Sequence, residues 1–166
     1  TGVQTCALPI CRMSDSTAAL AGLEPTEFSH EGITRTVYRG GSGPGVVVMP
    51  EMPGLTPNVA GFARRLIAEG FTVAVPSLFG TPGREPSTPY ILNSMVRGCV
   101  AKEFSNWAMS STSPITTWLR ALAADLHERA GGPGVGAVGM CFTGGFALGM
   151  MVDERMLAPV LSQPSL

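Results

Sequence analysis

The sequence has few of the features that mark proteins which bind nucleic acid or cross a membrane. Its 166 residues contain 11 Lys and Arg against 12 Asp and Glu, a net charge of −1, with no basic cluster. It therefore lacks an electrostatic footprint for nucleic acid or an anionic membrane surface, and we expect neither partner. Gly and Pro interrupt the apolar stretches well before the ~20 residues that a membrane-spanning helix needs, so we expect a soluble protein.

Histidine and cysteine are also scarce, and those present lack the spacing of a metal site. The two histidines, His30 and His127, are too few to build a convincing metal site. The four cysteines match neither zinc-ligand pairs nor a compact disulfide framework; they are Cys6, Cys11, Cys99 and Cys141. We therefore expect reduced thiols, a cytoplasmic location, and no metal or cofactor.

Apolar residues make up 45% of the chain and charged residues 14%, which is enough for one sizeable core. Short apolar runs typical of buried strands alternate with stretches in which apolar residues recur at helical spacing. The predicted strands cover Ile33–Arg39, Val46–Met49, Phe71–Val75 and Val135–Gly139, and the predicted helices run from Pro57 to before Gly70, from Pro114 through Leu126, and over Phe142–Val152. This alternation predicts an α/β fold with a mostly parallel sheet and helices on both faces.

The two ends of the chain look foreign or incomplete. Residues Thr1–Ile10 have no helical or strand period and resemble an in-frame translation of a sequencing adapter, so we interpret residues 1–12 as a non-native leader. A signal peptide is the alternative, but a basic region and a continuous apolar region are lacking. Leu157–Ser162 predicts a new buried strand just before the chain stops. We therefore interpret residues 13–166 as the N-terminal portion of a single domain whose C-terminal half is missing.

The stretch Gly139-Met140-Cys141-Phe142-Thr143 has the pattern of a nucleophile elbow. In such an elbow a sharp strand-to-helix turn exposes the nucleophile, and small residues two positions away avoid a clash with the adjoining chain. The helix N-terminus that follows favours the thiolate of a cysteine. The alternative is a small buried core cysteine beside a tight turn.

A second loop follows the strand Val46–Met49 and reads Pro50-Glu51-Met52-Pro53-Gly54. Ligands of parallel α/β sheets bind at the carboxyl ends of the strands, where this loop and the elbow both lie. In an α/β-hydrolase arrangement the two loops would each supply one backbone N–H to an oxyanion hole, and we assign these to Met52 and Phe142. Glu51 is either a solvated or capping carboxylate or part of the site.

From about Val46 to Ser162 the residues resemble the dienelactone hydrolase family, which has the α/β-hydrolase fold and a thiol nucleophile. The resemblance depends on the run Val46–Gly54, on Phe71–Pro76, and on Gly139-Met140-Cys141-Phe142. It implies a carboxymethylenebutenolidase-like hydrolase of small esters or lactones. It also implies that Cys141 attacks the ester carbonyl and that Glu51 helps to control the ionisation of the thiol.

Three departures from the family pattern limit what the resemblance implies. Thr143 stands where many members have glycine and adds a hydroxyl near the site. Arg84 could replace the family's substrate-binding arginine, although a solvated loop charge is the more ordinary role. The family's remaining triad members, an aspartate and a histidine, follow the elbow in chain order.

No residue in the chain fills those triad roles. Asp153 comes too soon after the elbow, and His30 and His127 precede it and are expected at the surface. We therefore expect an incomplete triad and little activity from this chain by itself.

Two other functions remain open at this point. Gly134, Gly136 and Gly139 match the spacing of a dinucleotide-binding loop, but they precede and occupy the predicted strand rather than follow it. A non-catalytic ligand-binding domain, or a domain with a redox-sensing thiol, is the second alternative. The sequence leaves the natural substrate and the oligomeric state undetermined.

Overall fold

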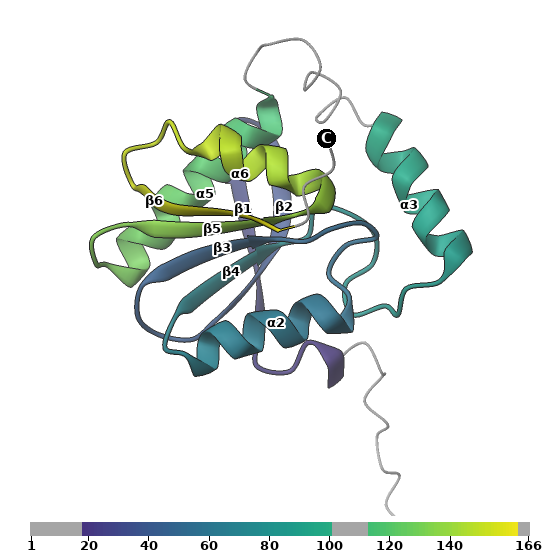
Figure 1. Cartoon of the computed structure of the whole chain (residues 1–166), viewed down its shortest axis with the longest axis horizontal. Helices are drawn as coiled ribbons and strands as arrows, with labels where there is room; N and C mark the ends of the chain where they lie inside the picture. Colours follow the sequence, from purple (N-terminus) through teal and green to yellow (C-terminus); the bar gives the residue numbers. More distant parts are fainter. Residues whose placement is uncertain (1–17, 101–112, 163–166) are drawn as a thin grey trace, which may run out of the picture.

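The structure is a computed structural model that describes residues 18–100 and 113–162, so the predicted leader, with Cys6 and Cys11, lies outside it. Within these residues six strands form one mixed sheet in the order β1-β2-β4-β3-β5-β6 (Figure 1). The strands are β1 (Glu24–His30), β2 (Ile33–Gly40), β3 (Gly45–Met49), β4 (Thr72–Pro76), β5 (Val135–Met140) and β6 (Met156–Ser162). The four strands β3 to β6 are mutually parallel, as predicted.

Helices cover both faces of the sheet. On one face lies α2 (Pro57–Ala68), and on the other lie α5 (Pro114–Ala130) and α6 (Gly144–Met150) (Figure 1). A further helix, α3 (Thr88–Val100), lies to one side of the sheet. The predicted α/β class with helices on both faces is confirmed. None of the helices among the described residues is long and apolar enough to cross a membrane.

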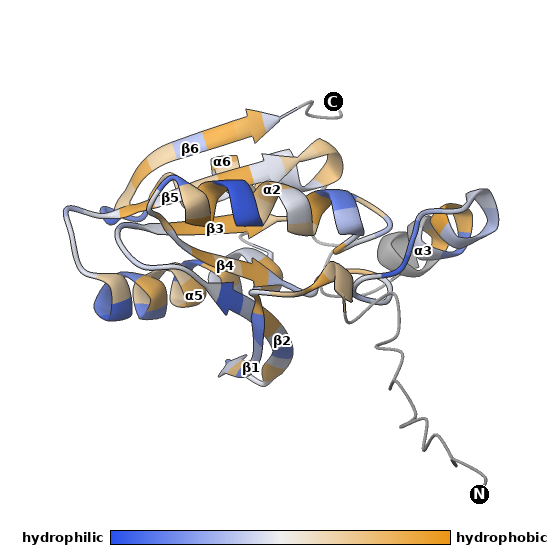
Figure 2. Ribbon diagram, turned by 90° about the horizontal axis from the view of Figure 1, so that it is seen from below, coloured by the Kyte–Doolittle hydropathy of each residue, from blue (hydrophilic) through white to orange (hydrophobic). Residues whose placement is uncertain are grey.

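Burial explains why the central strands are so apolar. All five residues of β3 are buried, because α5 packs on one side of this strand and α2 lies on the other. Figure 2 shows β3 as an almost wholly hydrophobic strand inside the sheet. Trp118 and Leu119 of α5 form part of the core on one face, and Val59 and Ala63 of α2 form part of the core on the other. The continuous run Val46–Met49 was therefore a reliable strand signal.

Two elements escaped the sequence analysis. Strand β1 forms an antiparallel hairpin with β2, in which His30 pairs with Ile33 and only Glu31 and Gly32 make the turn. Both turn residues have positive φ, 48° and 78°, as a tight two-residue hairpin requires. Glu31 is an unusual residue for such a position, which is why the hairpin gave no strong signal. Helix α3 begins at the end of the Gly/Pro-rich segment Pro76–Pro89, whose irregular sequence predicts neither a helix nor a strand.

The region after the elbow differs from the prediction in two ways. A 3-10 turn over Cys141–Thr143 precedes α6, so the helix ends at Met150 and Asp153 lies in the following turn rather than in a helix. Strand β6 exists as predicted but is not buried, since Leu157 is 57% exposed and Val160 is 49% exposed. The physical reason is its position at the edge of the sheet, where α6 covers only one of its faces.

Candidate active site

The elbow and the Glu51 loop leave the sheet side by side. Strands β3 and β5 are parallel neighbours, and their last paired residues are Met49 and Gly139. The chain that continues from each pair therefore emerges at the same edge, as the sequence analysis expected.

Cys141 has the backbone conformation of an exposed nucleophile. Its φ is 52°, a value that residues with a side chain seldom adopt, and it lies at the junction of β5 and the 3-10 turn. The residue is half-buried and its thiol is free. Strain of this kind costs of order 1–3 kcal/mol and persists only where the surrounding structure enforces it. The sharp turn predicted from the sequence is thus present, and it is not an ordinary core position.

Gly139 shows why the elbow needs a small residue two positions before Cys141. A Cβ atom at Gly139 would lie 2.5 Å from the carbonyl oxygen of Thr143 and 2.8 Å from the Cα of Gly144. These are backbone atoms of the turn itself and cannot move aside without opening it. The position of these glycines also removes the dinucleotide-binding interpretation, because Gly136 and Gly139 are strand residues of β5 rather than part of a loop before a helix.

The buried side chain of Thr143 stabilises the turn through hydrogen bonds. Its side chain is fully buried, and its hydroxyl oxygen accepts a hydrogen bond from the backbone N–H of Met140 at 2.8 Å. The same hydroxyl lies 2.9 Å from the carbonyl oxygens of Met49 and of Met140, to which it can donate. The extra hydroxyl noted in the sequence is therefore directed toward the end of β3.

Phe142 and Met52, the two predicted oxyanion-hole residues, have side chains packed against the same core. The Phe142 ring meets the Phe146 ring edge-on, with centroids 5.6 Å apart, and the Phe79 ring with centroids 6.1 Å apart. Met52 is partly buried against this core as well. Both side chains pack on the core, while both residues come shortly after β3 and β5, at the carboxyl edge of the sheet.

The loop after β4 also contributes to this edge, which the sequence analysis missed. Gly54 has a φ of 127°, and a Cβ there would lie 2.1 Å from the carbonyl oxygen of Phe79. The N–H of Gly83 donates to the carbonyl of Leu55 at 2.7 Å, which joins the same two loops again. Phe79 and Gly83 belong to the Gly/Pro-rich segment that had no period to interpret. The glycines of this segment were the sequence signal that could have indicated a close backbone contact.

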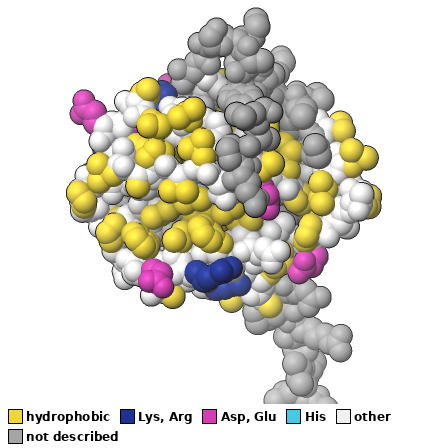
Figure 3. Space-filling view, in the orientation of Figure 1, with side chains coloured by type: hydrophobic (Ala, Val, Ile, Leu, Met, Phe, Trp, Pro, Cys, Tyr) yellow, Lys and Arg dark blue, Asp and Glu magenta, His cyan; other side chains and the backbone are white. Residues whose placement is uncertain are grey.

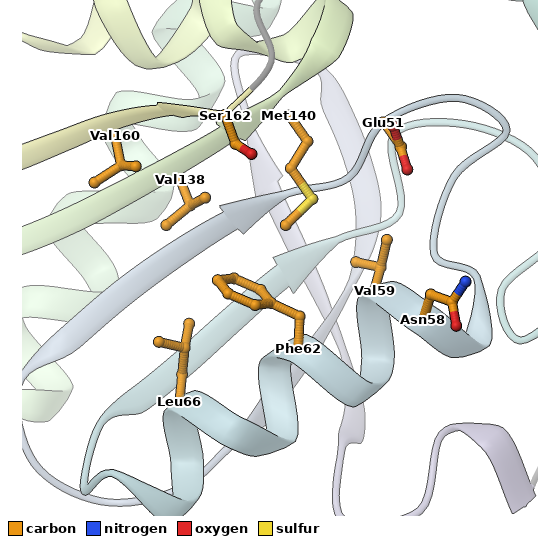
Figure 4. A pocket seen from close by; sticks show the side chains of 9 residues that line it. All are labelled: Glu51, Asn58, Val59, Phe62, Leu66, Val138, Met140, Val160 and Ser162. Carbon is orange, nitrogen blue, oxygen red and sulfur yellow. The ribbon is translucent and has the colours of Figure 1, made fainter.

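Glu51 lies at the rim of an apolar groove rather than in a buried cluster. The groove measures about 480 Å³ and runs between α2 and strands β5 and β6 (Figure 4). Its lining consists of Glu51, Asn58, Val59, Phe62, Leu66, Val138, Met140, Val160 and Ser162. Figure 3 shows the hydrophobic side chains gathered on this side of the molecule. Glu51 thus borders the groove together with Met140, the residue that precedes the predicted nucleophile.

Arg84 lies on the exposed loop after β4 and packs on an aromatic ring. Its guanidinium carbon is 4.2 Å from the centroid of the Tyr90 ring, a cation–π contact. The Tyr90 hydroxyl in turn accepts a hydrogen bond from the backbone N–H of Thr81. Arg84 is therefore held by α3 and remains exposed to solvent.

The remaining titratable candidates lie away from the elbow. Asp153 is in the turn before β6, and the backbone carbonyl oxygen of Arg155 in this turn accepts a hydrogen bond from the N–H of Val135, at the amino end of β5. A side-chain hydrogen bond from Arg155 lowers the pKa of Asp153 below its ordinary value, against a smaller opposing effect of burial. Asp153 is thus part of an ion pair at the opposite end of the sheet from the elbow.

The two histidines lie on elements away from the elbow, His127 at the amino end of the parallel strands and His30 on β1, with β2, β4 and β3 between it and β5. His127 belongs to the last turn of α5, next to Leu126, whose side chain meets Gly45 at the start of β3. His30 ends β1 at the hairpin turn. Both are half-buried rather than fully at the surface, and the Nδ1 atom of His127 is buried without a hydrogen-bond partner. Among the residues that the structure describes, no group of three or more His, Cys, Asp or Glu could hold a metal ion.

Residues 34–162 match the model of the dienelactone hydrolase family, a span that includes the β3 loop and the elbow. The chain belongs to the dienelactone hydrolase family. None of the curated proteins matches it.

Solved structures agree with the fold. The chain is similar to the structure named m3DLH, with 23% identity, a TM-score of 0.62, and coverage of 87% of this chain and 60% of that one. It is also similar to a dienelactone hydrolase-like promiscuous phosphotriesterase from metagenomic libraries, with 22% identity, a TM-score of 0.62, and coverage of 87% and 59%.

A haloalkane dehalogenase from Agrobacterium tumefaciens is a more distant neighbour, with 16% identity, a TM-score of 0.53, and coverage of 89% and 44%. At these identities the likeness establishes the α/β-hydrolase fold. The chain spans about three fifths of the length of the two dienelactone hydrolase-type structures.

Proposed function

We propose that the complete protein hydrolyses small esters or lactones, with Cys141 as the nucleophile. The observation that carries this proposal is the φ of 52° at Cys141, at the point where β5 ends beside the Glu51 loop. A strained residue at the carboxyl edge of a parallel sheet is how α/β-hydrolases expose a nucleophile. Membership of the dienelactone hydrolase family supports the same chemistry.

In the proposed reaction the Cys141 thiol first transfers its proton to a base, which we assign to Glu51. The thiolate attacks the carbonyl carbon, a C–S bond forms, and the carbonyl electron pair moves onto oxygen. The backbone N–H groups of Met52 and Phe142 stabilise this oxyanion. When the intermediate collapses, the C–O bond breaks and the alcohol leaves with the proton. Water then adds to the thioester, the C–S bond breaks, and the acid and the free thiol are released, so no cofactor takes part.

The direct test is replacement of the nucleophile in the complete gene product. With p-nitrophenyl acetate as substrate, we expect Cys141→Ala to lower kcat/KM by about a thousandfold or more. Cys99→Ala is the matched control, because it removes a thiol from α3 and should leave turnover unchanged. Unchanged turnover in Cys141→Ala would refute the proposal.

The proposed role of Glu51 as the base can be tested separately, by the rate at which Cys141 is alkylated. If the Glu51 carboxylate takes up the thiol proton, Glu51→Gln should slow both ester turnover and the alkylation of Cys141 by iodoacetamide. Asn58→Ala is the control, since Asn58 lines the same groove without a carboxylate. A Glu51→Gln protein that is alkylated at the wild-type rate would leave Glu51 without this role.

We also infer that the acid and the histidine of the triad come from a part of the protein beyond this sequence. The support is that Asp153 lies at the opposite end of the sheet from the elbow and that both histidines lie on elements away from it. The 166-residue chain should then turn over p-nitrophenyl acetate far more slowly than the complete gene product. Equal rates would contradict the inference.

Arg84 is the proposed contact for a substrate carboxylate. Its exposed guanidinium lies on the loop after β4, held against Tyr90. Arg84→Gln should raise KM for an ester that carries a free carboxylate and leave KM for p-nitrophenyl acetate unchanged. A phosphotriester belongs in the same substrate panel, because one structural neighbour is described as a promiscuous phosphotriesterase.

A further inference from the structure

Thr143 forms a link between two segments that lie far apart in the sequence. Its hydroxyl lies 2.9 Å from the carbonyl oxygen of Met49, a residue 94 positions earlier in the chain. Met49 is the last residue of β3, and Glu51 and Met52 follow almost directly. Thr143 itself comes two residues after Cys141. The hydroxyl therefore joins the segment with the predicted nucleophile to the segment with the predicted carboxylate and oxyanion donor.

The Thr143 hydrogen bond lies at the point where backbone pairing between β3 and β5 stops. The pair formed by Met49 and Gly139 is the last between β3 and β5. Beyond it the two chains diverge, one into the Glu51 loop and the other into the elbow. The Thr143 hydroxyl replaces the missing ladder contact at this point with a side-chain hydrogen bond.

Because Thr143 is buried, its hydroxyl group needs hydrogen-bond partners within the protein. A hydroxyl group that is fully removed from water is costly unless it has partners, and Thr143 is completely buried. Its oxygen accepts from the N–H of Met140, which holds the hydroxyl against the residue that precedes Cys141. Its single proton then faces two carbonyl oxygens, those of Met49 and of Met140. Loss of the hydroxyl would leave the Met140 N–H without this acceptor at the base of the elbow.

We propose that Thr143 is a positioning residue that sets the distance between the Cys141 elbow and the Glu51–Met52 loop. This inference depends on the proposed function, because it concerns the alignment of that same site. Catalytic groups displaced by about 1 Å can lose about a hundredfold in rate. Thr143 does not touch the substrate in this proposal and acts through the two backbone segments that its hydroxyl joins.

The experiment compares variants of Thr143 in the complete gene product. Thr143→Val keeps the shape and removes the hydroxyl, and we expect kcat for p-nitrophenyl acetate to fall about ten- to a hundredfold with little change in KM. Thr143→Ser restores the hydroxyl and should recover most of the rate. Thr116→Val is the matched control, because Thr116 is also buried but lies on α5. If the loss of any buried hydroxyl were enough to slow turnover, Thr116→Val would lower kcat as much as Thr143→Val.

Two readouts are independent of hydrolysis. The amide proton of Met140 should exchange with solvent at least about tenfold faster in Thr143→Val than in the wild type or in Thr143→Ser. The rate of alkylation of Cys141 by iodoacetamide should also change in Thr143→Val and be restored in Thr143→Ser. If Thr143→Val does not fold, Thr143→Ala makes the same comparison with a smaller side chain.

The outcomes separate the two proposals. Full activity in Cys141→Ala would refute the hydrolase mechanism, and the exchange and alkylation rates would still decide the role of Thr143. Wild-type kcat, exchange and alkylation in Thr143→Val would overturn the positioning role. A loss of kcat that Thr143→Ser does not restore would also overturn it, because the methyl group rather than the hydroxyl would then be responsible.

Discussion

The two ends of the parallel sheet are built in different ways. At the carboxyl end the chain has a cysteine with positive φ and backbone segments in close contact, as where Gly54 meets Phe79. At the amino end close backbone contacts occur as well, as where Gly43 meets Gly70, but side-chain ion pairs are found there too, such as Asp153 with Arg155 at 2.8 Å. Ion pairs near the surface contribute little to stability and tolerate change, whereas close backbone contacts leave no room for an added atom. The comparison indicates that the geometry of the candidate site depends on the main chain more than on charges.

The largest expected effect is at the loop contact of the carboxyl end. Gly54→Ala combines a φ of 127° with a Cβ placed 2.1 Å from the Phe79 carbonyl oxygen. We expect it to lower the free energy of unfolding by about 3 kcal/mol or more, measured by urea denaturation. Gly70→Ala is the control at the amino end, since its φ is 85° and no atom lies within 4 Å of the added Cβ. It should cost about 1 kcal/mol. Equal losses would show that the close contact with Phe79 adds nothing to the cost of the positive φ.

A smaller effect is expected within β5 at the elbow. Gly139→Ala would force the Thr143 carbonyl away from a Cβ at 2.5 Å, and we expect a loss of about 1–3 kcal/mol in unfolding free energy together with reduced turnover. Gly136→Ala, in the same strand, meets its nearest atom at 3.5 Å and should change stability by less than about 1 kcal/mol. A Gly136→Ala protein that loses as much stability as Gly139→Ala would remove the argument from close contact.

The smallest effect concerns the ion pair at the amino end. The hydrogen bond from Arg155 lowers the pKa of Asp153, so the stabilisation is present above the ordinary carboxyl pKa of about 4 and is lost as the pH falls through the lowered value. Asp153→Asn should therefore cost under about 1 kcal/mol at pH 7, and the difference from the wild type should shrink in acid. Glu154→Gln, at the neighbouring exposed carboxylate, serves as the control. Thermal unfolding at pH 7 and pH 3 provides the measurement, and a pH-independent difference would contradict this account.

The faces of the sheet give a second contrast, which bears on β6. One face carries α5 and α6, while α2 leaves an apolar groove of about 480 Å³ over β5 and β6 on the other. The apolar pattern of Leu157–Ser162 predicted a buried strand, but burial depends on what packs against a strand and not on its own residues. The strand itself was correct because its pairing with β5 is a property of the backbone.

Local sequence patterns were sufficient to predict an element where the pattern has one physical explanation. The buried run Val46–Met49 predicted β3, and glycine two positions before Cys141 predicted the sharp turn, since both signals arise from volume and periodicity. The hairpin was missed because β1 is mostly exposed, without a strong apolar alternation, and because Glu31 is an unusual residue for its turn. The 3-10 turn before α6 was missed because helix periodicity does not distinguish the first turn from the rest.

The sequence by itself determined the α/β class, the family and the place of Cys141 at the end of a strand, because these follow from apolar periodicity and from the small residues around one cysteine. Only the tertiary structure decided that the Thr143 hydroxyl reaches Met49, that Phe79 lies beside Gly54, and that Asp153 is at the far end of the sheet. Contacts between segments tens of residues apart depend on strand order and register. Strand order and register are fixed by the packing of the whole sheet, so a glycine can mark a close contact while its partner stays hidden in the local sequence.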